Sequence, residues 1–579
     1  MTRVVNVRLL ALVLALVLTA VACTTPDPDA TDTTVASGET TTTTEGTATE
    51  TTTTTAPAEP EGRTTLEVVL PTDPVGLNPF PETAGNMAVV HLAMFMPLIE
   101  VDENQDISSN ILESWETSTD AQTVTLKVRP GLEWSDGTPI TSADVSLALH
   151  MHLNSEISTR AGRLAGVAGV AEYTEGTADS ISGITVPDEA TVEIQLAEPD
   201  AAWVPNWASL GRLNSMFPAH ILGDVAPGDI PTHPFFETFP VVSGAYKFVE
   251  YVPEQYVELE ANENWSLGEP GFEQLFFKII TEPEARLAQF QTGEIQFVDG
   301  VSPLDVERIE GIDGVTVDSA TGLNPNVIGM NYDHPLLQDP RVRQALLFAI
   351  DREGICEQAL LGYCSVSATN QRLVGLDWAL PTVAEGAIEY TYDPDRAMEL
   401  LEEAGWDSSN TLNLLARPAG AGTAVSSAIS IMQAQWAAVG VDVEIVNVDV
   451  PTLLDNLGRE GRDPDSHMFW NAGAVFSLDP SSVQPYALCS THYPNGPNLT
   501  YYCNEEIDGL WAEARRTAVQ DERAEIYKEI YLALNQDPDY VYLAVLDNIV
   551  AFDSRLKGVK PQGDIWATYW NIGEWTWEE

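Results

Sequence analysis

Hydrophobic and polar residues alternate along several stretches of the chain, and the most informative stretch covers residues 111–153. At positions 124–128 every second residue is apolar, the period that is typical of a half-buried strand. Thr141 stands three residues before Asp144, a spacing that lets each side chain cap the other's backbone amide at a helix N-terminus. This stretch therefore predicts a strand, two turns and a helix.

The same two periods recur along the rest of the chain. Apolar or alternating runs predict strands at Leu66–Leu70, Ile184–Leu196, Leu412–Ala416, Val441–Ile445 and Tyr540–Val545. Apolar positions at helical spacing predict helices at Ala88–Met96, Pro218–Leu222, Glu282–Gln291, Pro394–Gly405, Ser426–Val439, Asn504–Ala518 and Glu522–Leu534, and one that Asp339 caps and Pro340 begins. Strands and helices that alternate in this way predict an α/β fold.

With 579 residues, the chain is long enough for two or three domains. Its formal net charge is −60, with only 27 Lys and Arg residues. Such a surface repels phosphate backbones, so the charge argues against nucleic-acid binding. A high negative charge suits solubility in a salty exterior, and it identifies no ligand.

The N-terminus predicts export and a lipid anchor. Arg3 and Arg8 precede an apolar run, Leu9 to Ala22, which is too short to span a membrane and ends in small residues before Cys23. This pattern is similar to a bacterial lipoprotein signal with Cys23 as the lipidated residue, and ordinary secretion with cleavage elsewhere is the alternative. Residues 24–63 are rich in Thr and almost free of apolar residues, which predicts a disordered tether.

Four cysteines remain once Cys23 is set aside, an even number that is typical of an exported protein in an oxidising compartment. Their proximity in the sequence predicts two disulfides, Cys356–Cys364 and Cys489–Cys503. The spacings do not suit a zinc site. Free buried thiols are the alternative.

Several separate motifs occur in the order known from one protein family. The residues ESW and TVTLKVRPGLEWSDGTPITSADV, within 111–153, resemble the signature of family 5 extracellular solute-binding proteins, the peptide- and nickel-binding lipoproteins of ABC importers. Other similar motifs are Pro71–Phe80, Gly293–Ile295, the block that begins at Asp339, and Pro240–Lys247, in which Gly244 permits a positive φ or a close backbone approach. The resemblance extends over most of the chain after the tether.

This resemblance implies an α/β, two-lobed periplasmic-binding-protein fold of type II, with the solute between the lobes and an extra domain in the N-terminal half. The implied parts are a signal peptide over 1–22, a lipid-anchored tether over 23–63, a first lobe over 64–325 with the extra domain inserted at about 105–215, a second lobe over 326–545, and a return to the first lobe over 546–579.

The resemblance also implies which residues line the cleft. Arg417 stands where dipeptide-binding members bind the peptide carboxylate, which a guanidinium group can do bidentately. Phe476 replaces the acid that pairs with a peptide's α-ammonium, so unmodified di- and tripeptides should bind weakly unless another acid, first of all Asp479, substitutes. A solvated cation is the alternative for Arg417, and core packing for Trp470. The expected ligand contacts are Asn86, Met87, Tyr246, Trp378, Arg417, Trp470, Asn471, Phe476 and Asp479.

Catalytic and metal-binding motifs are not visible in the sequence. His150 and His152 are two positions apart on a predicted helix, so they face different directions. We expect no enzyme activity, cofactor or metal. We expect instead a monomeric, lipid-anchored, extracytoplasmic subunit of an ABC importer that delivers a solute to the permease. The solute is peptide-like or otherwise extended, and modified peptides, oligosaccharides and metal chelates stay open. The alternative is a surface receptor of the same fold that senses a peptide or binds a partner without transport.

Overall fold

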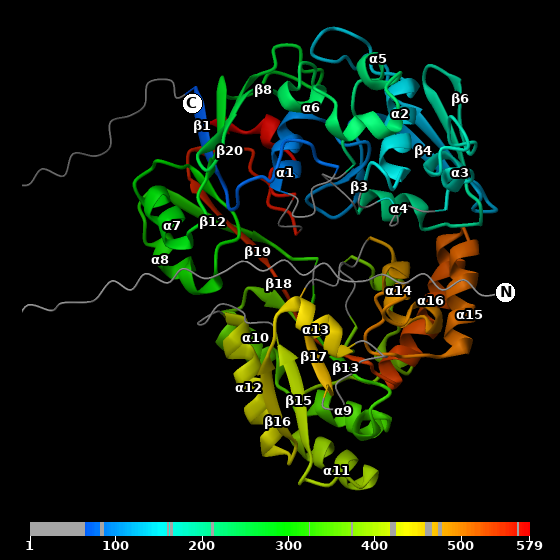
Figure 1. Ribbon diagram of the computed structural model, residues 1–579. Helices are drawn as coiled ribbons and strands as arrows, with labels where there is room; N and C mark the ends of the chain where they lie inside the picture. The colour runs from blue at the N-terminus through cyan, green and yellow to red at the C-terminus, as the bar shows by residue number, and fades with distance from the viewer. Residues whose placement is uncertain are drawn as a thin grey trace, which may run out of the picture. The chain divides into compact units, whose positions relative to one another are not determined.

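Sheets of seven, six and four strands organise the chain in the computed structural model (Figure 1). The expected signal peptide and tether, with Cys23, lie outside the described residues. The structure describes residues 64–80, 86–158, 161, 166–209, 214–323, 325–371, 375–416, 424–457, 466–472, 478–563 and 567–578, with the backbone alone at 86, 88, 450, 471 and 472.

The seven-stranded sheet is built around β1, the first strand that the sequence predicts. Strands β10 and β11 run parallel to β1 on either side, and the other strands join antiparallel. Segments from both ends of the chain therefore share one sheet. Its order is β12 (Val315–Ala320), β19 (Asn548–Asp553), β11 (Phe297–Val298), β1 (Thr65–Leu70), β10 (Gln274–Ile279), β9 (Tyr256–Ala261) and β8 (Tyr246–Val252).

The four-stranded antiparallel sheet contains the alternating stretch that opened the sequence analysis. The predicted strand is β5, with its apolar residues buried, and the predicted cap of the next helix is confirmed, because the Thr141 N–H donates to Asp144 Oδ2 at 2.8 Å. The sheet order is β4 (Leu112–Thr117), β5 (Thr123–Val128), β7 (Thr191–Gln195) and β6 (Ile184–Asp188).

The prediction of one strand over Ile184–Leu196 is wrong. The chain turns there and forms the hairpin of β6 and β7. The Asp188 carboxylate accepts a hydrogen bond from the Ala190 N–H at 2.9 Å. A short polar side chain that bonds to the backbone two residues on stabilises such a turn. Asp188 breaks the alternation of apolar and polar residues, but the alternation resumes at Ala190 in the same phase, so the period of two did not reveal the turn.

The six-stranded sheet lies in the second half of the chain. Strand β15 runs parallel to both β16 and β17, while β13 pairs antiparallel with β17 and β18. The order is β14 (Cys364–Ser365), β18 (Tyr540–Leu546), β13 (Pro325–Met330), β17 (Met468–Ala472), β15 (Thr411–Ala416) and β16 (Asp442–Asn447). Two further hairpins are β2 (Glu100–Val101) with β3 (Ile107–Ser108), and β20 (Leu556–Lys557) with β21 (Thr576–Trp577).

Two crossovers join the large sheets: β12 continues into β13, and β18 continues into β19. At the first crossover a Cβ atom on Gly322 would stand 1.9 Å from the Leu546 carbonyl oxygen, so the two crossovers touch. A few residues at the ends of elements are the usual form of a hinge between lobes. We call the elements around the seven- and four-stranded sheets the first lobe, and those around the six-stranded sheet the second lobe.

The predicted helices are present, with ends that differ from the prediction by at most two residues, and Asp339 caps its helix through the Arg341 N–H. The α-helices are α1 (Asn86–Met94), α2 (Ser142–Leu153), α3 (Val170–Thr174), α4 (Trp203–Ala208), α5 (Ala219–Leu222), α6 (Phe235–Thr238), α7 (Pro283–Gln291), α8 (Val306–Glu310), α9 (Pro340–Phe348), α10 (Arg352–Ala359), α11 (Pro394–Ala404), α12 (Ala424–Ala438), α13 (Val450–Leu457), α14 (Gln484–Ala487), α15 (Glu505–Arg516) and α16 (Gln520–Gln536). Short 3₁₀ helices are η3 (Pro227–Thr232), η4 (Pro303–Asp305), η5 (Pro335–Leu337), η6 (Asp377–Ala379), η7 (Val383–Glu385), η8 (Pro480–Val483), η9 (Cys489–Thr491) and η10 (Ile572–Glu574).

Each lobe has its own hydrophobic core. The first core joins the seven- and four-stranded sheets and includes Leu66, Trp134 and Trp575. The second core lies on the six-stranded sheet and includes Ile328 and Trp436. A smaller core forms between η6, α15 and α16. None of the helices in the described ranges combines the length and the apolarity that a membrane span requires.

Candidate functional site

Two of the expected cleft residues follow strands of the second lobe. Strand β15 ends at Ala416, directly before Arg417, and β17 ends at Ala472, four residues before Phe476. In the first lobe, β1 leads into the Pro71–Phe80 motif. Each of these strands has a parallel neighbour, and ligands of open α/β sheets bind outside the carboxyl ends of such strands. The three strand ends therefore mark the edges of the two sheets at which a solute would bind.

Several expected contacts fall outside the described part of the structure. Arg417 and Phe476 belong to segments that the structure does not describe, and so do the side chains of Asn86 and Asn471. Their backbone positions, where described, are the first residue of α1 for Asn86 and β17 for Asn471. Their roles as ligand contacts stay predictions.

Those expected aromatic and apolar contacts whose side chains the structure describes are buried or half-buried. Met87 and Tyr246 are fully buried in the first core, and Trp470 is 3% exposed in the second core. Trp378 is half-buried and meets the ring of Tyr527 with a centroid distance of 6.0 Å. In this structure these side chains contribute packing, and a role in ligand contact stays a prediction for each.

Asp479 lies in a buried ion pair. Its two carboxylate oxygens accept hydrogen bonds from one guanidinium nitrogen of Arg523 at 2.9 and 2.8 Å, and one of them also accepts the Tyr527 hydroxyl at 3.1 Å. Asp479 is 2% exposed and Arg523 5%. Burial disfavours the charged guanidinium, yet Asp479 and Tyr527 outweigh it and raise the pKa of Arg523. A ligand ammonium could pair with Asp479 only by competing with this buried cation.

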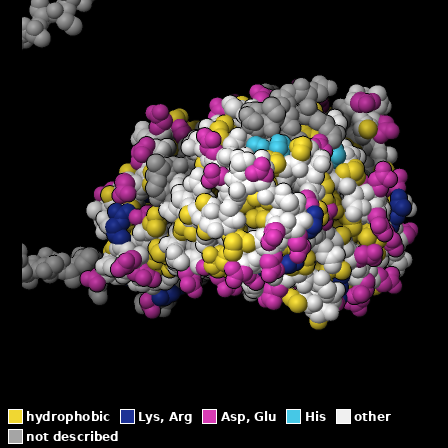
Figure 2. Space-filling view, turned by 90° about the horizontal axis from the view of Figure 1, so that it is seen from below, with side chains coloured by type: hydrophobic (Ala, Val, Ile, Leu, Met, Phe, Trp, Pro, Cys, Tyr) yellow, Lys and Arg dark blue, Asp and Glu magenta, His cyan; other side chains and the backbone are white. Residues whose placement is uncertain are grey.

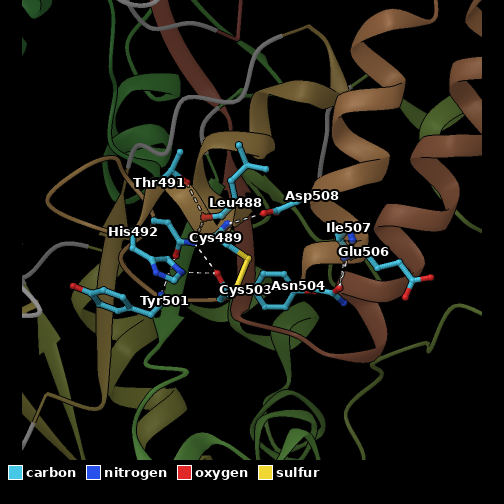
Figure 3. The surroundings of a disulfide bond; sticks show 12 residues. Leu488, Cys489, Thr491, His492, Tyr501, Cys503, Asn504, Glu506, Ile507 and Asp508 are labelled. Atoms are coloured by element: carbon cyan, nitrogen blue, oxygen red, sulfur yellow. Dashed lines mark hydrogen bonds between the residues drawn. A yellow bond between two sulfur atoms is a disulfide. The ribbon is translucent and has the colours of Figure 1, made fainter.

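The segment that follows Asp479 is attached at both ends to the hairpin of α15 and α16. At its start, the Tyr531 hydroxyl donates to the Pro480 carbonyl oxygen at 2.7 Å. At its end, Cys489 is bonded to Cys503, one residue before Asn504, the N-cap of α15 (Figure 3). The Cys489 N–H also donates to Asp508 on α15 at 3.2 Å. We call residues 478–489 the cleft segment, because they continue the predicted cleft loop.

Arg523 and the tyrosines beside it are not among the residues predicted from the sequence. The helix predicted at Glu522–Leu534 is supported by Ile526, Ile530 and Leu534, which are spaced by four and pack in or against the core with α15. Arg523, Tyr527 and Tyr531 are also spaced by four, so they form a second line on the helix that faces the cleft segment. This spacing was the available signal.

Both predicted disulfides are present. The Cα–Cα distances are 5.9 Å for Cys356–Cys364 and 4.5 Å for Cys489–Cys503. Within the described ranges, His, Cys, Asp and Glu side chains form no group that could hold a metal ion.

A small cavity lies beside the cleft segment in the second lobe. Its volume is about 20 Å³, room for about one water molecule and too little for an extended solute. Burial raises the pKa of Asp539 in its wall to about 7, against a hydrogen bond from Thr500. The lining residues are Asn370, Gln371, Val483, Tyr486, Ala487, Tyr531, Leu534, Asp539, Tyr540 and Tyr542.

Two α/β lobes, a double crossover and candidate loops at the carboxyl ends of parallel strands define a type II periplasmic-binding-protein fold. Residues 106–495 match the model of the bacterial extracellular solute-binding proteins, family 5 (middle region). The chain therefore belongs to this family.

Relatives and solved structures agree with this assignment. The chain is 31% identical over 414 residues to a Brucella ovis protein assigned to peptide binding in an ABC transporter, a match that covers 70% of this chain and 72% of the relative. It is 25% identical over 490 residues to the oligopeptide-binding protein AppA of Bacillus subtilis, covering 83% and 85%.

Among solved structures, the ABC transporter substrate-binding protein CtaP of Listeria monocytogenes superposes with a TM-score of 0.74 at 24% identity, covering 89% of this chain and 100% of CtaP. Bacillus subtilis AppA in complex with a nonapeptide superposes with a TM-score of 0.66 at 23% identity, covering 89% and 99%. These superpositions show the fold.

Proposed function

We propose that the protein is the extracytoplasmic substrate-binding subunit of an ABC importer, a monomer that encloses a solute between its lobes and delivers it to the permease. The observation that carries this proposal is the match of residues 106–495 to the family of extracellular solute-binding proteins, in a chain whose large sheets form two lobes. The names of the Brucella and Bacillus relatives support a peptide-like solute. A ligand that prefers the closed form shifts the protein toward it, and the permease would recognise that form.

Native mass spectrometry of the purified protein tests this function directly. We expect a bound small molecule that dissociates on denaturation with its mass unchanged, because a transport subunit releases its solute unaltered. A protein that carries no solute and gains no thermal stability with any member of a solute library would contradict the proposal. If the protein converts a solute into a product, it is an enzyme and not a binding subunit.

We infer that Cys23 carries a lipid anchor and that residues 24–63 separate the folded part from the membrane. The apolar run that ends at Cys23 supports this inference. The variant Cys23→Ala should release the protein into the medium, since acyl chains would be its anchor. Membrane fractionation unchanged by the substitution would show another mode of attachment.

We also propose that the solute has no free α-ammonium group at the end that faces the second lobe. Phe476 replaces the expected acid, and the nearby candidate substitute, Asp479, already binds Arg523. A melting assay checks this, because a ligand at about 100 times its Kd stabilises the fold by about 2.7 kcal/mol. Unmodified tripeptides should give little or no shift. A large shift that acetylation of the peptide amine abolishes would refute the proposal.

A further inference from the structure

The hairpin of α15 and α16, which holds the cleft segment, also contacts the first lobe. One guanidinium nitrogen of Arg515, near the end of α15, donates to Asp200 Oδ2 at 2.6 Å. The Ala201 N–H donates to the Arg515 carbonyl oxygen at 2.8 Å. Asp200 and Ala201 lie between β7 and α4, in the first lobe. We call these two hydrogen bonds the cross-lobe contact; they join the end of α15 to the residues shortly before α4, and both elements are labelled in Figure 1.

The cross-lobe contact is built to hold a charge pair. The Asp200 side chain is 8% exposed, and its other oxygen accepts the Ala202 N–H at 3.0 Å, which fixes the carboxylate at the start of α4. The Arg515 side chain is 40% exposed. The carboxylate is therefore oriented by its own lobe, while the guanidinium approaches from the other lobe and can leave into solvent.

A short chain of bonds links this contact to the cleft segment. The Nε–H of Arg523 donates to the carbonyl oxygen of Ala514, the residue before Arg515, at 3.3 Å. The same guanidinium binds Asp479. Leu478, directly before Asp479, packs against the first core. The cleft segment therefore touches the first lobe through Leu478 and, through the hairpin, at Asp200.

We propose that the arrangement of the lobes seen here is the closed one and that the α15–α16 hairpin is its latch: the Asp200–Arg515 contact stabilises this arrangement, and Arg523 sets the cleft segment in the position that it requires. The inference rests on the proposed function only where it takes the closed form as the solute-binding form. Arg515 and Asp200 act as positioning residues, because they act on the solute through the population of that form.

The partial exposure of the Asp200–Arg515 pair sets the expected size of its effect on the closed form. Ion pairs near the surface contribute up to about 1 kcal/mol, which corresponds to about a fivefold change in the ratio of closed to open forms. The apparent Kd for a solute rises by at most the same factor, because it equals the intrinsic Kd divided by the competent fraction. Salt should weaken the latch, since screening acts on exposed charges.

Hydrogen–deuterium exchange of the full, solute-free chain tests the latch without a known ligand. Asp200→Asn keeps the acceptor for the Ala202 N–H and removes the charge. In this first-lobe variant, exchange should become faster at residues 478–484 in the second lobe, by up to about fivefold. Arg515→Gln should speed exchange at residues 478–484 and also at residues 200–204. Arg515→Lys should retain part of the protection from exchange in both regions.

The matched control is Arg516→Gln, which removes the same charge at the exposed neighbouring position. It should leave exchange in both regions unchanged. Unchanged exchange at 478–484 in Asp200→Asn, or equal effects of Arg515→Gln and Arg516→Gln, would overturn the proposal. This experiment needs no solute. If no solute is found for the protein, the proposed function is contradicted, but the exchange result still decides whether the latch exists.

Discussion

Two backbone segments meet at Gly244, where the sequence analysis expected either a positive φ or a close approach. The structure shows the close approach: the Gly244 N–H donates to the Met94 carbonyl oxygen at 2.7 Å. A Cβ atom on Gly244 would stand 2.5 Å from the Ala93 carbonyl oxygen and 2.6 Å from the Met94 carbonyl carbon. The contact joins the end of α1 to the residues before β8, so a side chain here would separate two parts of the first lobe.

Gly244→Ala should lower the free energy of unfolding by about 1–3 kcal/mol, because backbone atoms cannot yield as a flexible side chain can. Denaturant titration measures this. The control is Gly228→Ala, where an added Cβ would meet nothing within 4 Å. Equal unfolding midpoints for the two variants would contradict the prediction.

His91 lies in an aromatic cluster of the first core. It is fully buried, with ring centroids of Phe239 at 5.2 Å and Phe95 at 5.5 Å. Burial lowers the pKa of His91 to about 3. The ring is therefore neutral in the folded protein across the physiological range.

This shift predicts a dependence of stability on acid. Because the folded pKa is below the unfolded value of 6.5, protons favour the unfolded state. The contribution of His91 is complete above pH 6.5 and is lost as the pH falls from 6.5 toward 3. The free energy of unfolding of the natural protein, relative to His91→Phe, should fall by about 1.4 kcal/mol per pH unit in that window. If the free energy of unfolding depends on pH in the same way in both proteins, His91 does not take up a proton on unfolding.

At the scale of elements, the α15–α16 hairpin has two roles that share residues. Tyr527, Ile530 and Tyr531 of α16 belong to the core with Trp511 of α15. The hydroxyl groups of the same two tyrosines, together with Arg523, hold the cleft segment. The disulfide Cys489–Cys503 attaches the far end of that segment beside the α15 N-cap (Figure 3). The segment's position therefore depends on the hairpin as much as on its own sequence.

Removal of this disulfide should destabilise the protein measurably. The bridge closes a sequence separation of 14 residues, and loop-closure entropy for such a loop corresponds to about 3 kcal/mol. The double variant Cys489→Ser, Cys503→Ser should unfold at lower denaturant and show faster hydrogen exchange in the cleft segment. The matched variant Cys356→Ser, Cys364→Ser should leave exchange of the cleft segment unchanged. The same exchange pattern in both variants would contradict a local role for the second bridge.

At the scale of the whole molecule, charge is strongly unbalanced. The chain has 87 Asp and Glu residues against 27 Lys and Arg, and Figure 2 shows acidic side chains spread over the visible face with few basic ones between them. Most described ion pairs are partly exposed, as between Lys247 and Glu260, and such pairs contribute little. Repulsion among carboxylates therefore outweighs their attraction to cations, and it opposes the compact state.

Sodium chloride should therefore raise the melting temperature. Raising the salt from about 0.1 M to about 1 M shortens the Debye length from about 10 Å to about 3 Å and screens this repulsion. The rise should appear with potassium chloride as well, because the effect is ionic strength and not the particular cation. A melting temperature that falls with either salt would show that attractive ion pairs dominate.

Several local elements and the two disulfides were predictable from the sequence because their causes are local. The strand at 123–128, the Thr141–Asp144 cap and the helices with apolar stripes depend on neighbours a few residues away, and both disulfides join cysteines close in sequence. Where two local signals compete, as at Asp188, the alternation led to the wrong element.

The pairing of distant residues was decided by the tertiary structure alone. Asp479 was predicted as a ligand acid, and only the packing of α16 shows that Arg523, 44 positions later, binds it. The contact of Asp200 with Arg515 joins residues 315 positions apart. No periodicity in the sequence encodes such pairs, because they arise when separately folded elements pack and bury charges that must then be matched. The sequence by itself thus determined many of the local elements, the family motifs and the two disulfides, and the fold decided which charges hold the cleft segment and connect the lobes.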